Sequence, residues 1–176
     1  ALAPSMRDAG DSCQRFARYV EELARRAVAE GRRPAWFVLE LARQCANVDF
    51  GELRRPWRFW SMLRQEPPVC FGPRGFRPDL VDDFHPARHY SAFLLIGFFF
   101  PQPLAVAFSR LWEWSEGVIL GQFSPNDVRM SQLAIRHGRA VRRAGPASLP
   151  ALIRCEICEA ETLDFSPFSC YNAANC

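Results

Sequence analysis

Carboxylates and histidines on apolar helix faces are the residues of this chain best suited to acid–base chemistry. Glu116 follows Phe108 and Trp112 at helical spacing, on a stripe that we expect to face inward, and Asp127 and His137 share an apolar stripe further along the chain. His89 opens the most apolar segment of all. A buried ionisable group costs free energy unless it is paired, so these positions are candidate functional sites.

If the helices that carry them pack together, these groups form a hydrolase-like catalytic centre. Burial beside an indole would raise the pKa of Glu116 and suit it to general-acid work. An ionised Asp127 would act as a base or stabilise positive charge. We therefore assign catalysis to Glu116, Asp127 and His89. We assign binding of a small-molecule or polymer substrate to Arg88, His137 and Trp112.

Structural roles compete with this interpretation. The run Ser124-Pro125-Asn126-Asp127 is typical of a helix start, so capping alone accounts for Asp127. Glu116 has an ordinary role as the ion-pair partner of an arginine. Nucleophile-elbow and phosphate-loop motifs are absent from the sequence, which excludes the enzymes that depend on them.

The cysteines allow two cross-linking chemistries. The chain has seven of them, and Cys155, Cys158, Cys170 and Cys176 fall within its last 22 residues. Two short-spaced pairs can supply four thiolates to a structural zinc ion. Disulfides that join Cys170 or Cys176 to earlier cysteines are the alternative, and buried thiols are the third option. No other cofactor is expected.

The basic residues are all arginines, 22 of them, and the chain has no lysine. This excludes Schiff-base and Walker-type lysine chemistry. A GC-rich genome accounts for the bias, and avoidance of lysine-directed modification in a host cell is the alternative. The net charge is only +3, so steering toward nucleic acid is weak and nucleic acid is not expected as a partner. The first residues, Ala-Leu-Ala-Pro-Ser, resemble the small-residue remnant of a cleaved export signal, and on that basis we expect an exported or secreted protein.

These candidate residues depend on helices for their placement. Apolar periodicity, caps and Pro/Gly punctuation predict helices over residues 12–30, 34–46, 89–100, 103–120 and 125–144, with a last one from 148. A shorter apolar segment lies near 50–64. Residues 65–86 are rich in proline and glycine and predict an irregular connection, and the cysteine-rich tail from Thr162 is also predicted to be irregular.

The stretch from His89 to Ser109 contains no Asp, Glu, Lys or Arg. Pro101-Gln102-Pro103 divides it into halves that are each too short to span a bilayer. We therefore expect two core helices joined by a tight turn. A hydrophobic hairpin that inserts into a membrane is the alternative.

The sequence thus predicts an all-α fold, with residues 1–176 as a single domain. It would be a compact orthogonal bundle of six or seven helices around a buried apolar helix pair. The leading functional hypothesis is a helical hydrolase-like protein that acts as an exported bacterial effector or toxin. The second is a helical interaction module that binds a partner protein and has a zinc- or disulfide-stapled tail. The third is a membrane-inserting helical protein.

Overall fold

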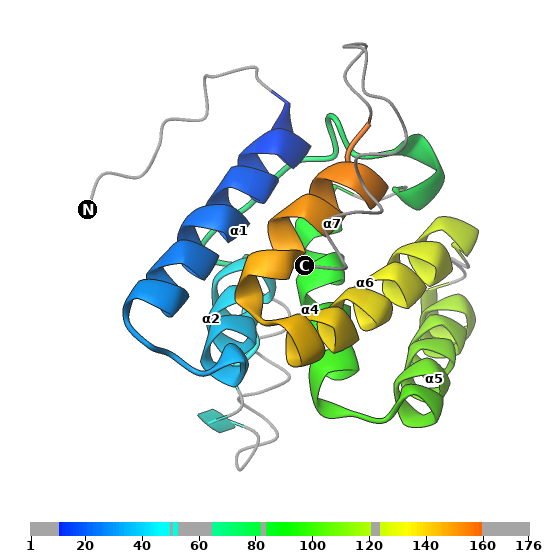
Figure 1. Cartoon of the computed structure of the whole chain (residues 1–176). Coiled ribbons are helices and arrows are strands. Elements are labelled where there is room, and N and C mark those ends of the chain that lie inside the picture. The colour runs from blue at the N-terminus through cyan, green and yellow to red at the C-terminus, as the bar shows by residue number, and fades with distance from the viewer. Residues whose placement is uncertain (1–10, 50, 53–64, 82–83, 121–123, 160–176) are drawn as a thin grey trace.

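The computed structural model describes residues 11–49, 51–52, 65–81, 84–120 and 124–159, and the side chains of 113 and 115–120 lie outside this description. The helices of the described chain are α1 (Ser12–Ala29), α2 (Pro34–Ala46), α4 (Pro86–Phe99), α5 (Gln102–Leu120), α6 (Pro125–Ala144) and α7 (Leu149–Glu156). Two short 3-10 turns, η2 (Pro78–Leu80) and η3 (Pro146–Ser148), complete them. The prediction of a compact all-α bundle is confirmed (Figure 1). The apolar segment near 50–64 and the cysteine-rich tail fall almost entirely outside the described residues.

Helix α1 is capped by Asp11, the residue directly before it. The carboxylate of Asp11 accepts hydrogen bonds from the backbone N–H groups of Cys13, at 2.9 Å, and Gln14, at 3.1 Å. These are two of the donors that a helix start leaves without a partner inside the helix. The cap fixes the position of Cys13, whose side chain is fully buried.

Helix α4 forms the centre of the bundle and α6 crosses it (Figure 1). The crossing is a contact of backbone on backbone, because each helix has a glycine at the contact point. A Cβ atom on Gly97 would lie 2.3 Å from the carbonyl oxygen of Ile135, and one on Gly138 would lie 2.1 Å from that of Leu94. Any larger residue at either position would force α4 and α6 apart.

Helix α5 differs from the predicted pair of buried helices, because only one side of it is covered. It lies at the edge of the bundle (Figure 1), where it packs mainly against α6. Ala105 and Ser109 are buried, whereas Leu104, Phe108 and Leu111 are 48–62% exposed. The apolar stretch is therefore part core and part surface. None of the described helices is long and apolar enough to cross a membrane.

The irregular connection predicted at 65–86 joins the two ends of the fold. Its backbone accepts a hydrogen bond from Cys13 at the start of α1, through the carbonyl oxygen of Arg74 at 3.1 Å. It also pairs with the end of α7, where Arg77 N–H donates to the carbonyl oxygen of Ile157 at 2.9 Å. Gly75 has a φ of +77° and lies against the Asp11 side chain, a conformation and a contact that exclude a side chain.

Candidate functional site

Three sets of residues have the chemistry of a site: the predicted catalytic residues, a buried tyrosine–histidine–carboxylate series, and the cysteines. The predicted catalytic residues are only partly described. His89 and Asp127 come close at the contact between α4 and α6, where His89 Nε2 lies 2.7 Å from Ser131 Oγ and 3.3 Å from the backbone oxygen of Asp127. The side chain of Glu116 lies outside the described residues, so its role stays a prediction.

The His89–Ser131 pair has the distance of a general base and a nucleophile. Ser131 is fully buried, however, so its hydroxyl does not reach solvent in this structure. Asp127 lies at the third position of α6, where its backbone N–H donates to Ser124 Oγ at 3.0 Å. The predicted helix cap is therefore present, and the pair links α4 to the start of α6.

The predicted inward stripe of α5 is wrong at Phe108, which is 48% exposed. The buried positions are Ala105 and Ser109, and Trp112 is half-buried against the core. The covered side of α5 is therefore rotated from the predicted side. The sequence did not determine which side is covered, because α5 is apolar around most of its circumference. Arg88, the remaining predicted substrate-binding residue, is half-buried in the first turn of α4.

His137 belongs to a different series of polar groups, in which Tyr90 and His137 are fully buried and Glu156 is half-buried. Its Nδ1 atom lies 2.8 Å from the hydroxyl of Tyr90, and its Nε2 atom lies 3.5 Å from Oε2 of Glu156. Both ring-bearing side chains have no exposed surface. The carboxylate beside Nε2 favours the tautomer with its proton on that atom, so the Tyr90 hydroxyl donates to Nδ1.

The electrostatics of this series are set by burial and by one carboxylate. Burial, and next the negative charge of Glu156, hold the pKa of Tyr90 well above its usual value. The His137 ring, and next the charge of Arg136, hold the pKa of Glu156 below its usual range. Tyr90 is thus a neutral hydrogen-bond donor and Glu156 an ionised acceptor at neutral pH.

One interaction in the series is incomplete. The contact between His137 Nε2 and Glu156 is too long for a good hydrogen bond, and this buried nitrogen has no other partner. The Glu156 carboxylate is instead directed to Arg136, with which it forms an ion pair. Tyr90 and Glu156 were not among the predicted site residues. Glu156 is the only carboxylate of α7, and neither its spacing nor its neighbours in the sequence pointed to this role.

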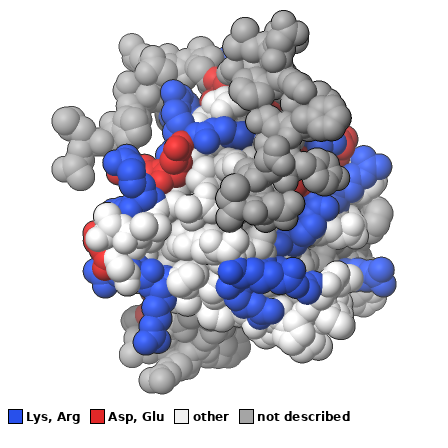
Figure 2. Space-filling model, in the orientation of Figure 1, with Lys and Arg blue, Asp and Glu red and all other residues white. Residues whose placement is uncertain are grey.

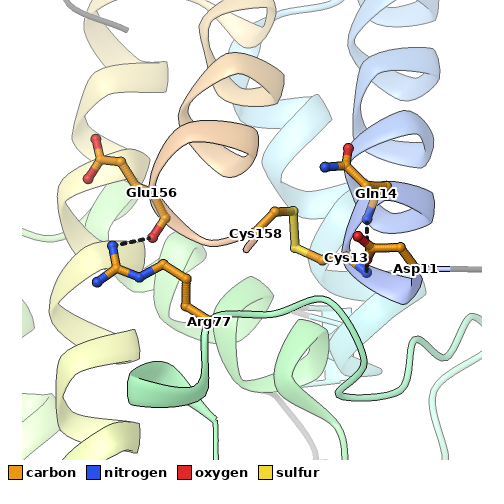
Figure 3. The surroundings of a disulfide bond; sticks show 6 residues. All are labelled: Asp11, Cys13, Gln14, Arg77, Glu156 and Cys158. Carbon is orange, nitrogen blue, oxygen red and sulfur yellow. Dashed lines mark hydrogen bonds between the residues drawn. A yellow bond between two sulfur atoms is a disulfide. The ribbon is translucent and has the colours of Figure 1, made fainter. Parts of the chain in front are cut away.

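The cysteines form at least one disulfide, between Cys13 at the start of α1 and Cys158 after the end of α7 (Figure 3). The two residues are 145 positions apart, and their Cα atoms are 5.5 Å apart. Figure 3 shows Arg77 beside this bond, where its Nη1 atom donates to the backbone oxygen of Glu156 at 3.3 Å. The disulfide therefore joins the first and last described helices next to the irregular connection.

The other cysteines bear on the alternative zinc site. Cys155 is also disulfide-bonded, and sulfur atoms in disulfides are not thiolate ligands. Cys170 and Cys176 lie outside the described residues, so the four-cysteine site stays a prediction for a reduced chain. No group of three or more metal-ligating side chains occurs among the residues that the structure describes.

Two cysteines of the described chain are free thiols. Cys45 is buried in α2, and burial raises its pKa to about 12. Its thiol is therefore protonated at neutral pH. Cys70 is exposed in the irregular connection.

Two shallow depressions mark the described surface, with volumes of about 210 and 320 Å³. The smaller one lies beside Trp36 on α2, and the larger one lies between η2, α6 and α7. Neither is lined by His89 or Asp127. The hydrolase interpretation stays a prediction.

Most of the large apolar side chains that are exposed among the described residues belong to α5 and to the residues just before it. They are Phe99, Phe100, Leu104, Phe108, Leu111 and Trp114, which are 42–64% exposed, and we call this surface the α5 face. No protein-family model matches this chain, and no curated protein or solved structure is similar enough to it to count as a match.

Proposed function

We propose that this chain is a disulfide-stapled helical binding module that docks on an anionic membrane surface through the α5 face. The exposed apolar side of α5 is the observation that carries this proposal. It supports a binding role over the hydrolase of the sequence-based hypothesis, with the helices lying along the membrane surface in this proposal. The disulfide favours a compartment in which thiols are oxidised.

The α5 face is larger than the scattered apolar residues of an ordinary protein surface. Leu104, Phe108 and Leu111 follow one another at helical i, i+4 and i+7 spacing, and Trp114 extends the same side of the helix. The exposed fractions of the six side chains amount to about three whole large side chains, on the order of 500 Å². The largest apolar patch of a monomeric protein has about this area and is often functional.

Arginines border this face and supply the charge complementarity. Arg110 lies on α5 itself and is exposed. Arg139 binds the side chain of Gln102 at the start of α5, and Arg142 donates to the backbone oxygen of Phe98 at 3.3 Å. Figure 2 shows arginine side chains beside uncharged surface on the side of the molecule where α6 lies.

This combination fits a lipid interface better than the other possible occupants. Aromatic and leucine side chains next to arginines are typical of segments that lie in the headgroup region of anionic bilayers. A second copy of the chain would add its own arginines to the same interface. A partner protein would need an apolar groove with an acidic rim, because the α5 face is the convex side of a helix.

Flotation with lipid vesicles tests the proposal. The protein should float with vesicles of phosphatidylserine and phosphatidylcholine, and much less with phosphatidylcholine alone. Replacing Leu104 and Leu111 together by serine should weaken binding about thirtyfold, because each side chain is about 60% exposed and its burial contributes about 1 kcal/mol. Arg142→Gln should weaken binding to the anionic vesicles by about 1 kcal/mol.

Val28→Ser provides the matched control. Val28 is also 61% exposed and apolar, but it lies on α1 and outside the α5 face. This variant should float like the wild type. A wild-type protein that does not float with anionic vesicles refutes membrane docking and leaves a partner protein as the occupant. Equal flotation of the leucine variant and the wild type excludes the α5 face as the site.

A further inference from the structure

A shallow groove of about 320 Å³ between η2, α6 and α7 has a different character from the α5 face. Its polar lining includes three guanidinium groups, those of Arg77, Arg129 and Arg136, and two carboxylates, those of Asp79 and Glu156. Gln132 lies between Arg129 and Arg136 on the same side of α6. The groove therefore offers an excess of positive charge and of N–H donors.

The three arginines differ in how strongly they are engaged. Arg77 is held by both oxygens of Asp79, at 3.1 and 2.9 Å, and by the backbone oxygen of Glu156. Arg136 is paired with the Glu156 carboxylate, and Arg129 forms none of the ion pairs found among the described residues, although its positive charge acts on Asp79. The donors open to a new anion are thus those of α6.

The Glu156 carboxylate lies between two groups that compete for it. On the groove side is Arg136, with which it is paired, and on the core side is the Nε2 atom of His137 at 3.5 Å. That nitrogen is fully buried and lacks a hydrogen-bond partner. A buried donor without a partner is unfavourable, so a rotation of Glu156 toward His137 would satisfy it. The same rotation would leave Arg136 without an anion.

We infer that the groove is a binding site for a phosphate group, held by Arg129, Gln132 and Arg136, whose entry displaces Glu156 onto His137. The ligand oxygens replace the carboxylate on Arg136, and two arginines meet the double negative charge of a phosphomonoester. Glu156 then accepts the Nε2–H of His137 and completes the series that begins at Tyr90. Figure 3 shows the side chain of Glu156 leaving α7 toward α6, the position from which this exchange takes place.

Histidine NMR detects both phosphate binding and the movement of Glu156 onto His137. The signals can be told apart because the chain has only three histidines. The full-length protein, labelled with nitrogen-15 in its histidines, is titrated with inorganic phosphate at constant ionic strength. We expect a saturable downfield shift of the His137 Nε2–H signal, as that proton enters a hydrogen bond. His137 is assigned by its loss in a His137→Gln sample.

Two variants separate binding from the exchange of partners. Arg129→Gln should weaken phosphate binding at least tenfold, and Arg143→Gln, an exposed arginine further along α6, is the matched control and should leave it unchanged. Glu156→Gln removes the competing charge, so it should bind phosphate more tightly while the His137 response disappears. If the Glu156 carboxylate had only a structural role, Glu156→Gln would not be expected to bind phosphate more tightly and at the same time to lose the change in the His137 signal.

Two further measurements identify the source of the phosphate group. Glycerol 3-phosphate represents a soluble ligand, and phosphatidic acid vesicles represent a lipid headgroup; stronger binding of one identifies the source. The vesicle arm uses the Leu104→Ser/Leu111→Ser variant, so that the α5 face does not contribute. The inference is overturned if phosphate shifts the signal no more than chloride does, or if Arg129→Gln and Arg143→Gln bind alike.

Discussion

Removal of the Cys13–Cys158 disulfide is the perturbation whose effect the structure defines best. The bond closes a loop with a sequence separation of 145 residues. In the chain-entropy treatment, opening a loop of that length frees the unfolded chain by about 5 kcal/mol. Native disulfides of small domains commonly contribute about 2–5 kcal/mol, so we expect a loss in that range.

The Cys13→Ala/Cys158→Ala variant isolates this bond from the one that Cys155 makes. Its free energy of unfolding is measured by urea denaturation, followed by circular dichroism at the helix band. Both sulfur atoms are buried, so part of the loss comes from the space that they leave.

Cys45→Ala measures that second contribution, because Cys45 is a buried free thiol with 1% exposure. Twice the Cys45→Ala effect is subtracted from the loss in the double variant, and the remainder is the effect of the cross-link. Cys70→Ala, at an exposed free thiol, is the control for oxidation during purification. A remainder below about 1 kcal/mol would refute the reasoning, since the unfolded chain would then gain little freedom.

Three further predictions concern the core and its polar series. Gly138→Ala should destabilise the protein by about 1–3 kcal/mol or more in urea denaturation, because the new Cβ would lie 2.1 Å from the backbone oxygen of Leu94; unchanged stability would contradict the close crossing. Tyr90→Phe should cost about 1–3 kcal/mol by the same measurement, because His137 Nδ1 then lacks its buried donor, and a neutral effect would exclude that hydrogen bond. The lowered pKa of Glu156 means that its ionised form stabilises the fold above the ordinary carboxyl range, and that this contribution is lost as the pH falls through the folded-state pKa. Urea midpoints recorded from neutral pH down to about pH 3 should therefore fall less steeply for Glu156→Gln than for the wild type, and parallel curves would contradict the assignment.

The helices could be predicted from the sequence because their boundaries are local. Pro34 and Pro125 lie at the first position of the helices they were predicted to start, and the apolar stripe of α6 from Met130 to Val141 is buried. Such features depend on spacing and on the chemistry of single residues.

The side of α5 that faces the core could not be predicted in the same way. An apolar helix has no polar face to show which side is outward, and the inferred stripe through Phe108 was therefore wrong. The covered side is decided by where α6 lies, which is a tertiary property. Whether Glu116 shares that side stays a prediction.

The partners of the cysteines and of His137 also depend on tertiary packing. Cys13 and Cys158 are brought together by the ends of α1 and α7, and cysteine spacing alone does not determine connectivity. His137 was correctly placed on the inward stripe of α6, but its neighbours Tyr90 and Glu156 come from two other helices. A sequence shows which groups are buried more readily than which groups they meet.

Quenching of Trp114 fluorescence by brominated lipids is the most direct test of membrane docking. Trp114 is 64% exposed at the far end of the α5 face from Phe100. In vesicles that contain phosphatidylserine and brominated phosphatidylcholine, the wild-type protein should be quenched, and Trp114→Phe should lose most of that quenching while it still binds. No quenching in the wild type, or the same quenching in Trp114→Phe, would contradict the proposal that the α5 face enters the membrane surface.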